Sequence, residues 1–434
     1  MADVLSADLN AVAVESLDDL WLPVFVRNHP FLDRLTMKKA GGTGYRIPVE
    51  TGPGGGASGS FGSSLTNSAA NGFTADGFTV PPAILYGTTR IQWQDQVYSE
   101  TPQSPVDIAL NSTKNALEIA TENLADMLLG STSGAAGAMA VISTATNTAG
   151  NIWDLVLTVP TDAAKFVLGN VIRQKATASA ALGTGSGTVT GVNPLGGVIT
   201  VDVGATGMVP ATTQIIGLEG QLPATTDTSG LYPSVLQWIP PAANRSANGV
   251  PTTTTFLGVD RSAQSAVTMV SGWGFNGTGV PIFQAVYATA AYMNNASKLA
   301  KPDTLFVNPL IGPKMAQECD QKMRYDMKSV NGVDVEFAGF TIVLPTGKCD
   351  VLMEPSMPVT QMLLSKSGTW EFAPPNGGKI FRPATNGKMI IDDFGAGTGL
   401  NQSRCSVMAT GFFGCNSPSA NAVITVGIGT GLNL

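Results

Sequence analysis

The stretch SPVDIALNSTKNALEIATENLADMLLG (Ser104–Gly130) carries the clearest structural signal in this chain of 434 residues. Ser104 is a favoured N-cap residue, and Pro105 suits the first helical position. Small or apolar side chains then recur at spacings of three and four, on one helix face: Val106, Leu110, Thr113, Leu117, Ala120, Leu124 and Leu128. Gly130 is a typical helix end. The pattern predicts a helix of about 38 Å, which suits a spine across a flat domain.

Upstream of this helix, the sequence predicts an arm and a long β-hairpin. Residues 1–40 show a loose amphipathic pattern that prolines interrupt, as expected of an arm. Tyr45–Glu50 alternates like a strand, and the runs Phe78–Val80 and Ile84–Trp93 are expected to return along it. The tract Thr51–Gly77 between them is dominated by Gly, Ser, Ala and Asn, which predicts a flexible tip. A loop of this length in a compact domain is usually functional.

Downstream of the helix, the pattern changes to short strands and then to a mixture of strands and helices. Alternating runs between Phe166 and Val203 predict a small β-barrel inserted over residues 160–258. Pro281–Leu299 has the spacing of an amphipathic helix. Asn308-Pro309 is a typical helix start and follows the buried strand Thr304–Val307. The predicted fold class is therefore α+β with an inserted β-barrel.

The composition argues for a surface that faces other proteins. Only 13% of the residues are charged, about half the ~25% of a typical soluble domain. The net charge is −7, and without a Lys/Arg run the chain is not expected to bind nucleic acid sequence-specifically. No uninterrupted apolar stretch predicts a membrane span, and the N-terminus does not have the pattern of a secretory signal.

Motifs for catalysis or cofactor binding are weak. The glycines from Gly54 to Gly59 have dinucleotide-motif spacing, but no helix is predicted after them to hold a pyrophosphate. The single histidine, His29, is expected to be packed or solvated rather than catalytic. The adjacent acids Asp392 and Asp393 point to opposite faces if they lie in a strand. We therefore expect no enzyme activity, metal or cofactor. An enzyme, such as a glycan hydrolase with a β-barrel module, is the weakest of the alternative functions.

The four cysteines are expected to be buried reduced thiols. None of them has CxxC spacing: Cys319, Cys349, Cys405 and Cys415. A Cys405–Cys415 bridge is conceivable if the two lie at neighbouring strand positions, although a reducing cytosol argues against it.

Seven segments, in this order, resemble the major capsid proteins of tailed bacteriophages. Each is weak alone, but their order over roughly 170 residues is fairly specific. The segments are LGVDRSAQ (Leu257–Gln264), PIFQAVYATAAYM (Pro281–Met293), KPDTLFVNP (Lys301–Pro309), VEFAGFTIVLPTG (Val335–Gly347), CDVLMEPSMP (Cys349–Pro358), TQMLLSKSGTWEF (Thr360–Phe372) and MATGFFGCNSPSANAVI (Met408–Ile424).

The resemblance implies the Hong Kong phage-type capsid fold and a division of the chain. The implied parts are an N-terminal arm (1–40), an extended loop (41–98), a peripheral domain with the spine helix (99–159; helix 105–129), the β-barrel insertion (160–258), an axial domain (259–395) and C-terminal strands returning to the peripheral domain (396–434).

The implied function is self-assembly into the icosahedral shell that encloses the double-stranded DNA of a tailed bacteriophage. Implied partners are copies of the chain itself in hexamers and pentamers, a portal protein at one vertex and decoration proteins. A charged scaffolding prodomain is not recognisable, so we expect either a separate scaffold protein or none. The implied location is the virion, with assembly in the host cytoplasm. Another β-rich phage protein, a tail-tube or adhesin subunit, is the alternative.

The few charges are expected to matter at contacts between subunits. Some members of the family cross-link through a Lys and an Asn, but no motif here assigns such positions, and we expect non-covalent assembly. The candidate inter-subunit contact residues are Arg90, Trp93, Arg324, Arg382, Asp392 and Asp393.

Overall fold

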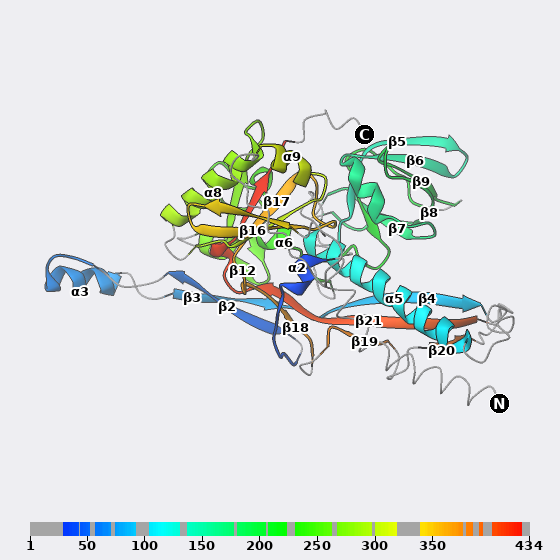
Figure 1. Ribbon diagram of the computed structural model, residues 1–434, viewed down its shortest axis with the longest axis horizontal. Coiled ribbons are helices and arrows are strands. Elements are labelled where there is room, and N and C mark those ends of the chain that lie inside the picture. The colour runs from blue at the N-terminus through cyan, green and yellow to red at the C-terminus, as the bar shows by residue number, and fades with distance from the viewer. Residues whose placement is uncertain are drawn as a thin grey trace, which may run out of the picture.

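The structure is a computed structural model that describes residues 29–42, 44–52, 57–70, 74–92, 104–130, 137–177, 180–204, 207–223, 231–262, 267–296, 300–318, 339–375, 379–384, 390–393 and 402–427. Two mixed sheets and a barrel form the body, with the long helix α5 (Ser104–Leu129) across one sheet and a hairpin projecting from one end (Figure 1).

Helix α5 has the bounds that the sequence predicts, and the described part of its apolar stripe, from Thr113 on, is buried. Leu117, Ala120, Leu124 and Leu128 are fully buried. The helix packs on the strands β4 (Ala83–Gln92) and β21 (Gln402–Cys415), as Figure 1 shows. Helix and strand approach so closely at Gly87 that a Cβ there would lie 2.5 Å from the carbonyl oxygen of Ala116. Gly87 is therefore required for this packing.

The sheet under this helix, called here the α5 sheet, is organised around β21. Its strands follow the order β1-β18-β21-β19, and β4 and β20 also pair with β21. Their bounds are β1 Thr36–Met37, β18 Trp370–Ala373, β19 Phe381–Pro383 and β20 Ile390–Asp393. The short helix α2 (Pro30–Asp33) precedes β1. Strands from both ends of the chain thus share one sheet.

The second sheet, called the α8 sheet, has the order β13-β22-β17-β14-β16-β15. Its strands are β13 (Trp273–Asn276), β14 (Thr304–Val307), β15 (Gly339–Leu344), β16 (Gly347–Met353), β17 (Gln361–Ser365) and β22 (Ala422–Thr425). Helices α8 (Ile282–Ala296) and α9 (Gly312–Glu318) flank it, after the one-turn helices α6 (Val235–Trp238) and α7 (Val267–Ser271). The predicted helix after Asn308 thus begins four residues later.

The β-barrel is present, but it begins earlier than the sequence predicts. Six strands close it in the order β10-β5-β6-β9-β8-β7. They are β5 (Ala140–Ala149), β6 (Ile152–Leu157), β7 (Val171–Lys175), β8 (Gly187–Asn193), β9 (Val198–Asp202) and β10 (Ile215–Leu218). The range 160–258 therefore misses β5 and β6 at its start, and at its end it includes Trp238 and Phe256, which pack in the main core rather than in the barrel. The Ala- and Thr-rich β5 has too little apolar alternation to signal a half-buried strand.

The hairpin differs from the prediction in its second strand and in its tip. β2 (Tyr45–Gly52) pairs with β3 (Thr74–Val80), whereas β4 turns away and pairs with β21. The helix α3 (Phe61–Ala70) lies in the Gly/Ser-rich tract that predicted a flexible loop. Among the described residues, no helix is long and apolar enough to cross a membrane.

Candidate functional site

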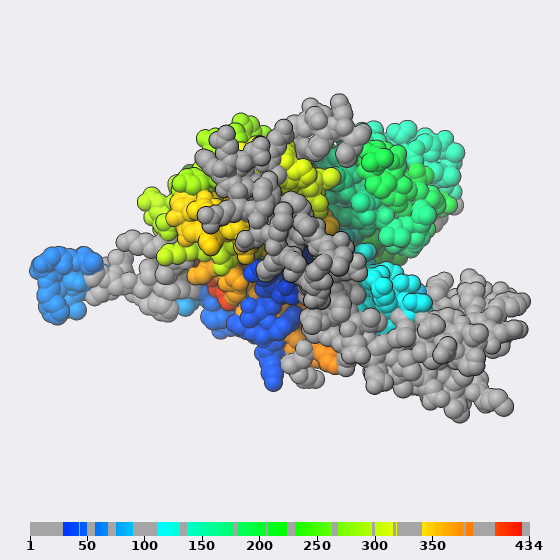
Figure 2. Space-filling view, in the orientation of Figure 1, coloured from blue at the N-terminus to red at the C-terminus, as the bar shows by residue number. Residues whose placement is uncertain are grey.

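The projecting hairpin ends in a helix that carries exposed apolar side chains. Phe61 is 85% exposed and Leu65 is 61% exposed, one helical turn apart on α3. Residues 51–75 include no charged side chain. Figures 1 and 2 show α3 at the far end of the projection, away from the sheets and the barrel. A small uncharged helix with an apolar stripe cannot form a core of its own, so this surface needs a partner.

The root of the hairpin is fixed to the body by aromatic packing. Phe78, at the end of β3, lies edge-on to Trp238 with ring centroids 4.8 Å apart. Phe256 lies 5.2 Å from the Trp238 ring, again edge-on. All three side chains are buried, so the hairpin leaves the body from a rigid base.

Arg261 holds these aromatic residues in place. Its guanidinium carbon lies 4.0 Å from the centre of the Phe256 ring. Its Nη1 donates to the carbonyl of Gln237 at 2.9 Å, and its Nη2 donates to that of Trp238 at 3.4 Å. The planar guanidinium can stack and donate at the same time, a combination that lysine does not offer.

A second exposed apolar surface lies on the outer side of helix α8. Tyr287 is 46% exposed and Val343, on β15, is 64% exposed. Together with Phe283 and Gln284 they line a shallow hollow. Aromatic side chains gathered at an exposed surface are typical of protein interfaces.

The structure brings three of the predicted contact residues to one end of the α5 sheet. Arg90 on β4 pairs with Arg404 of β21, and Asp392 on β20 pairs with the adjacent Ser403. Asp393 pairs with Gln402. The side chains of the three predicted residues lie outside the described part of the structure, so their role in contacts stays a prediction.

The other three predicted contact residues are separate from this group. Arg382, on β19, is half-buried and donates to the carbonyl of Pro375 within its own chain. Trp93 and Arg324 lie outside the described residues. A role for any of the three between subunits also stays a prediction.

The described cysteines are free and buried, as expected; Cys319 lies outside the described residues. Burial raises the pKa of the Cys405 thiol to about 11. A Cys405–Cys415 bridge is impossible because both residues lie in the single strand β21, ten positions apart, and a strand rises about 3.3 Å per residue.

Within the described residues, no three His, Cys, Asp or Glu side chains lie together as a metal site. His29 is packed, one of the two expected outcomes: its Nδ1 lies 2.9 Å from Oε1 of the buried Glu354.

Two features of the structure were not predicted from the sequence. Phe61 and Leu65 have helical i, i+4 spacing, a signal that the surrounding Gly and Ser residues obscured. The His29–Glu354 pair has no local signal because 325 residues separate its members.

Comparison with known proteins gives structural matches only. No protein-family model matches the sequence, and neither does any curated protein. The chain is similar to the structure titled cyanophage A-1(L) capsid asymmetric unit, with 9% identity, 91% of this chain and 90% of that one covered, and a TM-score of 0.45.

Two further structures are similar over the same extent. That of Mycobacterium phage Ogopogo has 10% identity, 92% of each chain covered and a TM-score of 0.41. The capsid of a native GTA particle has 9% identity, 91% and 88% covered, and a TM-score of 0.45. The solved structures that the chain resembles thus include phage capsid shells.

Proposed function

We propose that this chain is the major capsid protein of a tailed bacteriophage, a structural subunit that self-assembles into the icosahedral shell around double-stranded DNA. The observation that carries the proposal is the hairpin β2–α3–β3. It projects from the body, has no charged residue between positions 51 and 75, and exposes Phe61 and Leu65 at its end. Such an extension gains stability only by burying its tip on another molecule.

A second copy of the chain is the partner that the remaining surface fits best. The exposed aromatic residues on α8 offer a further contact area, and 13% charged residues leave little repulsion between copies. The net charge of −7 keeps the inner wall of a shell from trapping a polyanionic genome.

The sequence resemblance supports finer assignments within this proposal. The domains keep the boundaries given above, except that the barrel insertion covers the strands from Ala140 to Leu218. The chain forms hexamers and pentamers, meets a portal protein at one vertex, and is assembled in the host cytoplasm into the virion. Assembly is non-covalent, with a separate scaffold protein or none, and decoration proteins are further candidates for partners.

Electron microscopy of the purified full chain tests the proposal. We expect closed shells or capsomer rings. Stacked tubes would support a tail-tube subunit instead. Monomers that fail to associate across salt, pH and concentration would overturn the proposal.

A further inference from the structure

Six segments that are far apart in the sequence meet around one cavity of about 980 Å³. They are the turn before α2, strand β4, helix α5, the short 3-10 helix η1 (Pro160–Lys165) next to the barrel with the loop after it, the turn after β14, and the loop after β16. Each contributes a polar or ionisable side chain: His29, Tyr86, Glu122, Asp126, Asp162, Lys165, Asn308 and Ser356. The cavity is thus the joint between the N-terminal turn, the spine helix, the barrel and the α8 sheet.

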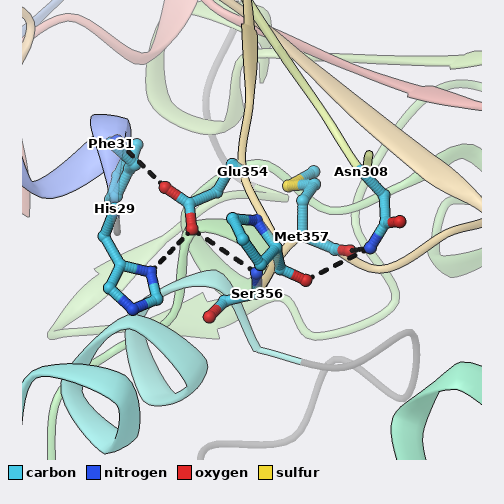
Figure 3. Close-up of polar contacts among 7 residues, drawn as sticks. His29, Phe31, Asn308, Glu354, Ser356 and Met357 are labelled. Carbon is cyan, nitrogen blue, oxygen red and sulfur yellow. Dashed lines mark hydrogen bonds and ion pairs between the residues drawn. The ribbon is translucent and has the colours of Figure 1, made fainter. Parts of the chain in front are cut away.

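The first connection in this joint is built on Glu354, which is fully buried. Its Oε1 is 2.9 Å from Nδ1 of His29, and its Oε2 accepts the backbone N–H of Phe31 at 3.0 Å (Figure 3). The backbone N–H of Ser356 completes the set at 3.4 Å. A buried carboxylate requires such partners, so Glu354 fastens the N-terminal turn to the α8 sheet.

Asn308 keeps the loop that carries Glu354 in shape. Its Nδ2 donates to the carbonyls of Pro355 and Met357, at 3.2 and 2.7 Å (Figure 3). Its Oδ1 accepts the N–H of Leu310 at 3.0 Å. The carboxylate therefore sits on a loop that its own hydrogen bonds hold in shape.

The second connection joins the spine helix to the barrel side and to the same loop. Lys165 forms a 3.0 Å ion pair with Asp162, and its Nζ lies 3.5 Å from the carbonyl of Gly130 at the end of α5. Asp126 of α5 accepts a hydrogen bond from Ser356 and is attracted by Lys165 and His29, while Glu122 repels it. Asp126 therefore couples the two connections.

The pKa values of two groups in the joint are raised above their ordinary values. Burial by itself lowers the pKa of His29, but the hydrogen bond and charge of Glu354, helped by Asp126 and Glu122, hold it above the ordinary 6.5. Burial raises the pKa of Asp126 to about 6, against the opposing attraction of Lys165 and the other partners.

Both groups make the folded chain less stable as the pH rises. The stability that protonated His29 contributes is complete below pH 6.5 and is lost as the pH rises through its folded-state pKa. Ionised Asp126 is disfavoured in the folded chain, so stability also falls as the pH rises from its ordinary pKa of 3.8 to about 6. These two groups therefore make the joint tighter at acidic than at neutral pH.

We propose that this joint is a proton-controlled latch, which fastens the turn at His29–Asp33 and the η1 side of the barrel to the Glu354–Met357 loop and loosens when it loses protons. The cavity gives the parts room to shift. This device goes beyond the proposed assembly function and is a property of the single chain.

Hydrogen exchange of the full chain between pH 5.5 and 8.5, corrected for intrinsic rates, tests the latch. Protection of the Phe31 amide is expected to fall about tenfold across this range, with a midpoint above pH 6.5. H29Q should flatten this profile, and D126N should remove its lower-pH part. R34Q is the matched control: it breaks the exposed 3.7 Å pair with Asp350 near the same turn and should keep the wild-type profile.

The single histidine allows a second measurement that does not depend on a variant folding. Titration of ¹³C-histidine by NMR should give His29 a pKa above 6.5, and E354Q should lower it. A wild-type value at or below 6.5, or a pH profile of protection that H29Q and D126N leave unchanged, would overturn the latch.

Discussion

The projecting hairpin and the closed barrel are two β structures that differ in how their strand edges are satisfied. In the barrel, β10 pairs with both β5 and β7, so every strand has two neighbours. Its interior is filled by buried side chains such as Leu155, Ile199 and Val201. In the described part of the chain the hairpin is a sheet of two strands that pairs with no third strand, and it carries an exposed helix at its end.

The difference indicates which part of the chain depends on other copies. An isolated two-stranded hairpin is marginal in water, whereas a closed barrel removes its own edges. We therefore expect changes at the hairpin tip to act on assembly and changes in the barrel to act on folding.

The largest effect is expected from charges at the tip. The variants F61D and L65D, alone and combined, place a carboxylate where an apolar contact forms. Loss of an anchor worth about 2 kcal/mol or more should reduce the assembled fraction more than about tenfold. Analytical ultracentrifugation and electron microscopy measure assembly, and circular dichroism should show unchanged folding.

A matched control for this prediction lies in the barrel. Leu195, in the turn between β8 and β9, is 79% exposed, so L195D adds the same charge at a similarly exposed site. We expect it to assemble normally. Normal shells from the F61D/L65D double variant would remove the observation on which the proposed function rests.

The second effect concerns the core of the barrel. I199A removes a fully buried side chain next to Leu155 of the paired strand β6. Such truncations cost about 2–5 kcal/mol. Hydrogen exchange should show lost protection in β5–β10 alone, with β2, β3 and α5 unchanged; loss spread over the whole chain would mean that the barrel is not a separate folding unit.

The contrast between hairpin and spine helix also shows what the sequence can reveal. Helix α5 was predictable because its N-cap, apolar stripe and Gly130 are local signals. Helix α3 was not, since seven of its ten residues are Gly, Ser, Ala or Asn and mask the Phe61–Leu65 pair. A local sequence pattern does not predict a helix where small polar residues dominate the composition.

The pairing of strands far apart in the chain could not be predicted from the sequence, for another reason. Ile84 pairs with Thr410 across more than 300 residues, and no periodicity identifies a partner at that distance. The same holds for His29 and Glu354. The candidate contact residues Arg90 and Asp392 were identified as charges in a charge-poor chain, but their common place beside β21 required the fold.

A smaller effect is expected at the root of the hairpin. R261K keeps the positive charge but cannot both stack on Phe256 and donate to the two carbonyls of Gln237 and Trp238. We expect a loss of about 1–2 kcal/mol in the free energy of unfolding, measured by denaturant titration of the unassembled chain. Faster exchange in β3 but not in the barrel would locate the change; an equal response in both would contradict the rigid root.

The smallest effect is expected from an ion pair on the barrel surface. Arg173 on β7 lies 3.4 Å from Glu219, whose side chain is half exposed. An exposed pair contributes about 0–1 kcal/mol; E219Q breaks it while leaving the bond from Arg173 to the carbonyl of Gly183 intact. We expect a change below about 1 kcal/mol in denaturant unfolding, because strand pairing and the buried core close the barrel. A loss as large as that of I199A would mean that surface charge, rather than the core, holds β7 against β10.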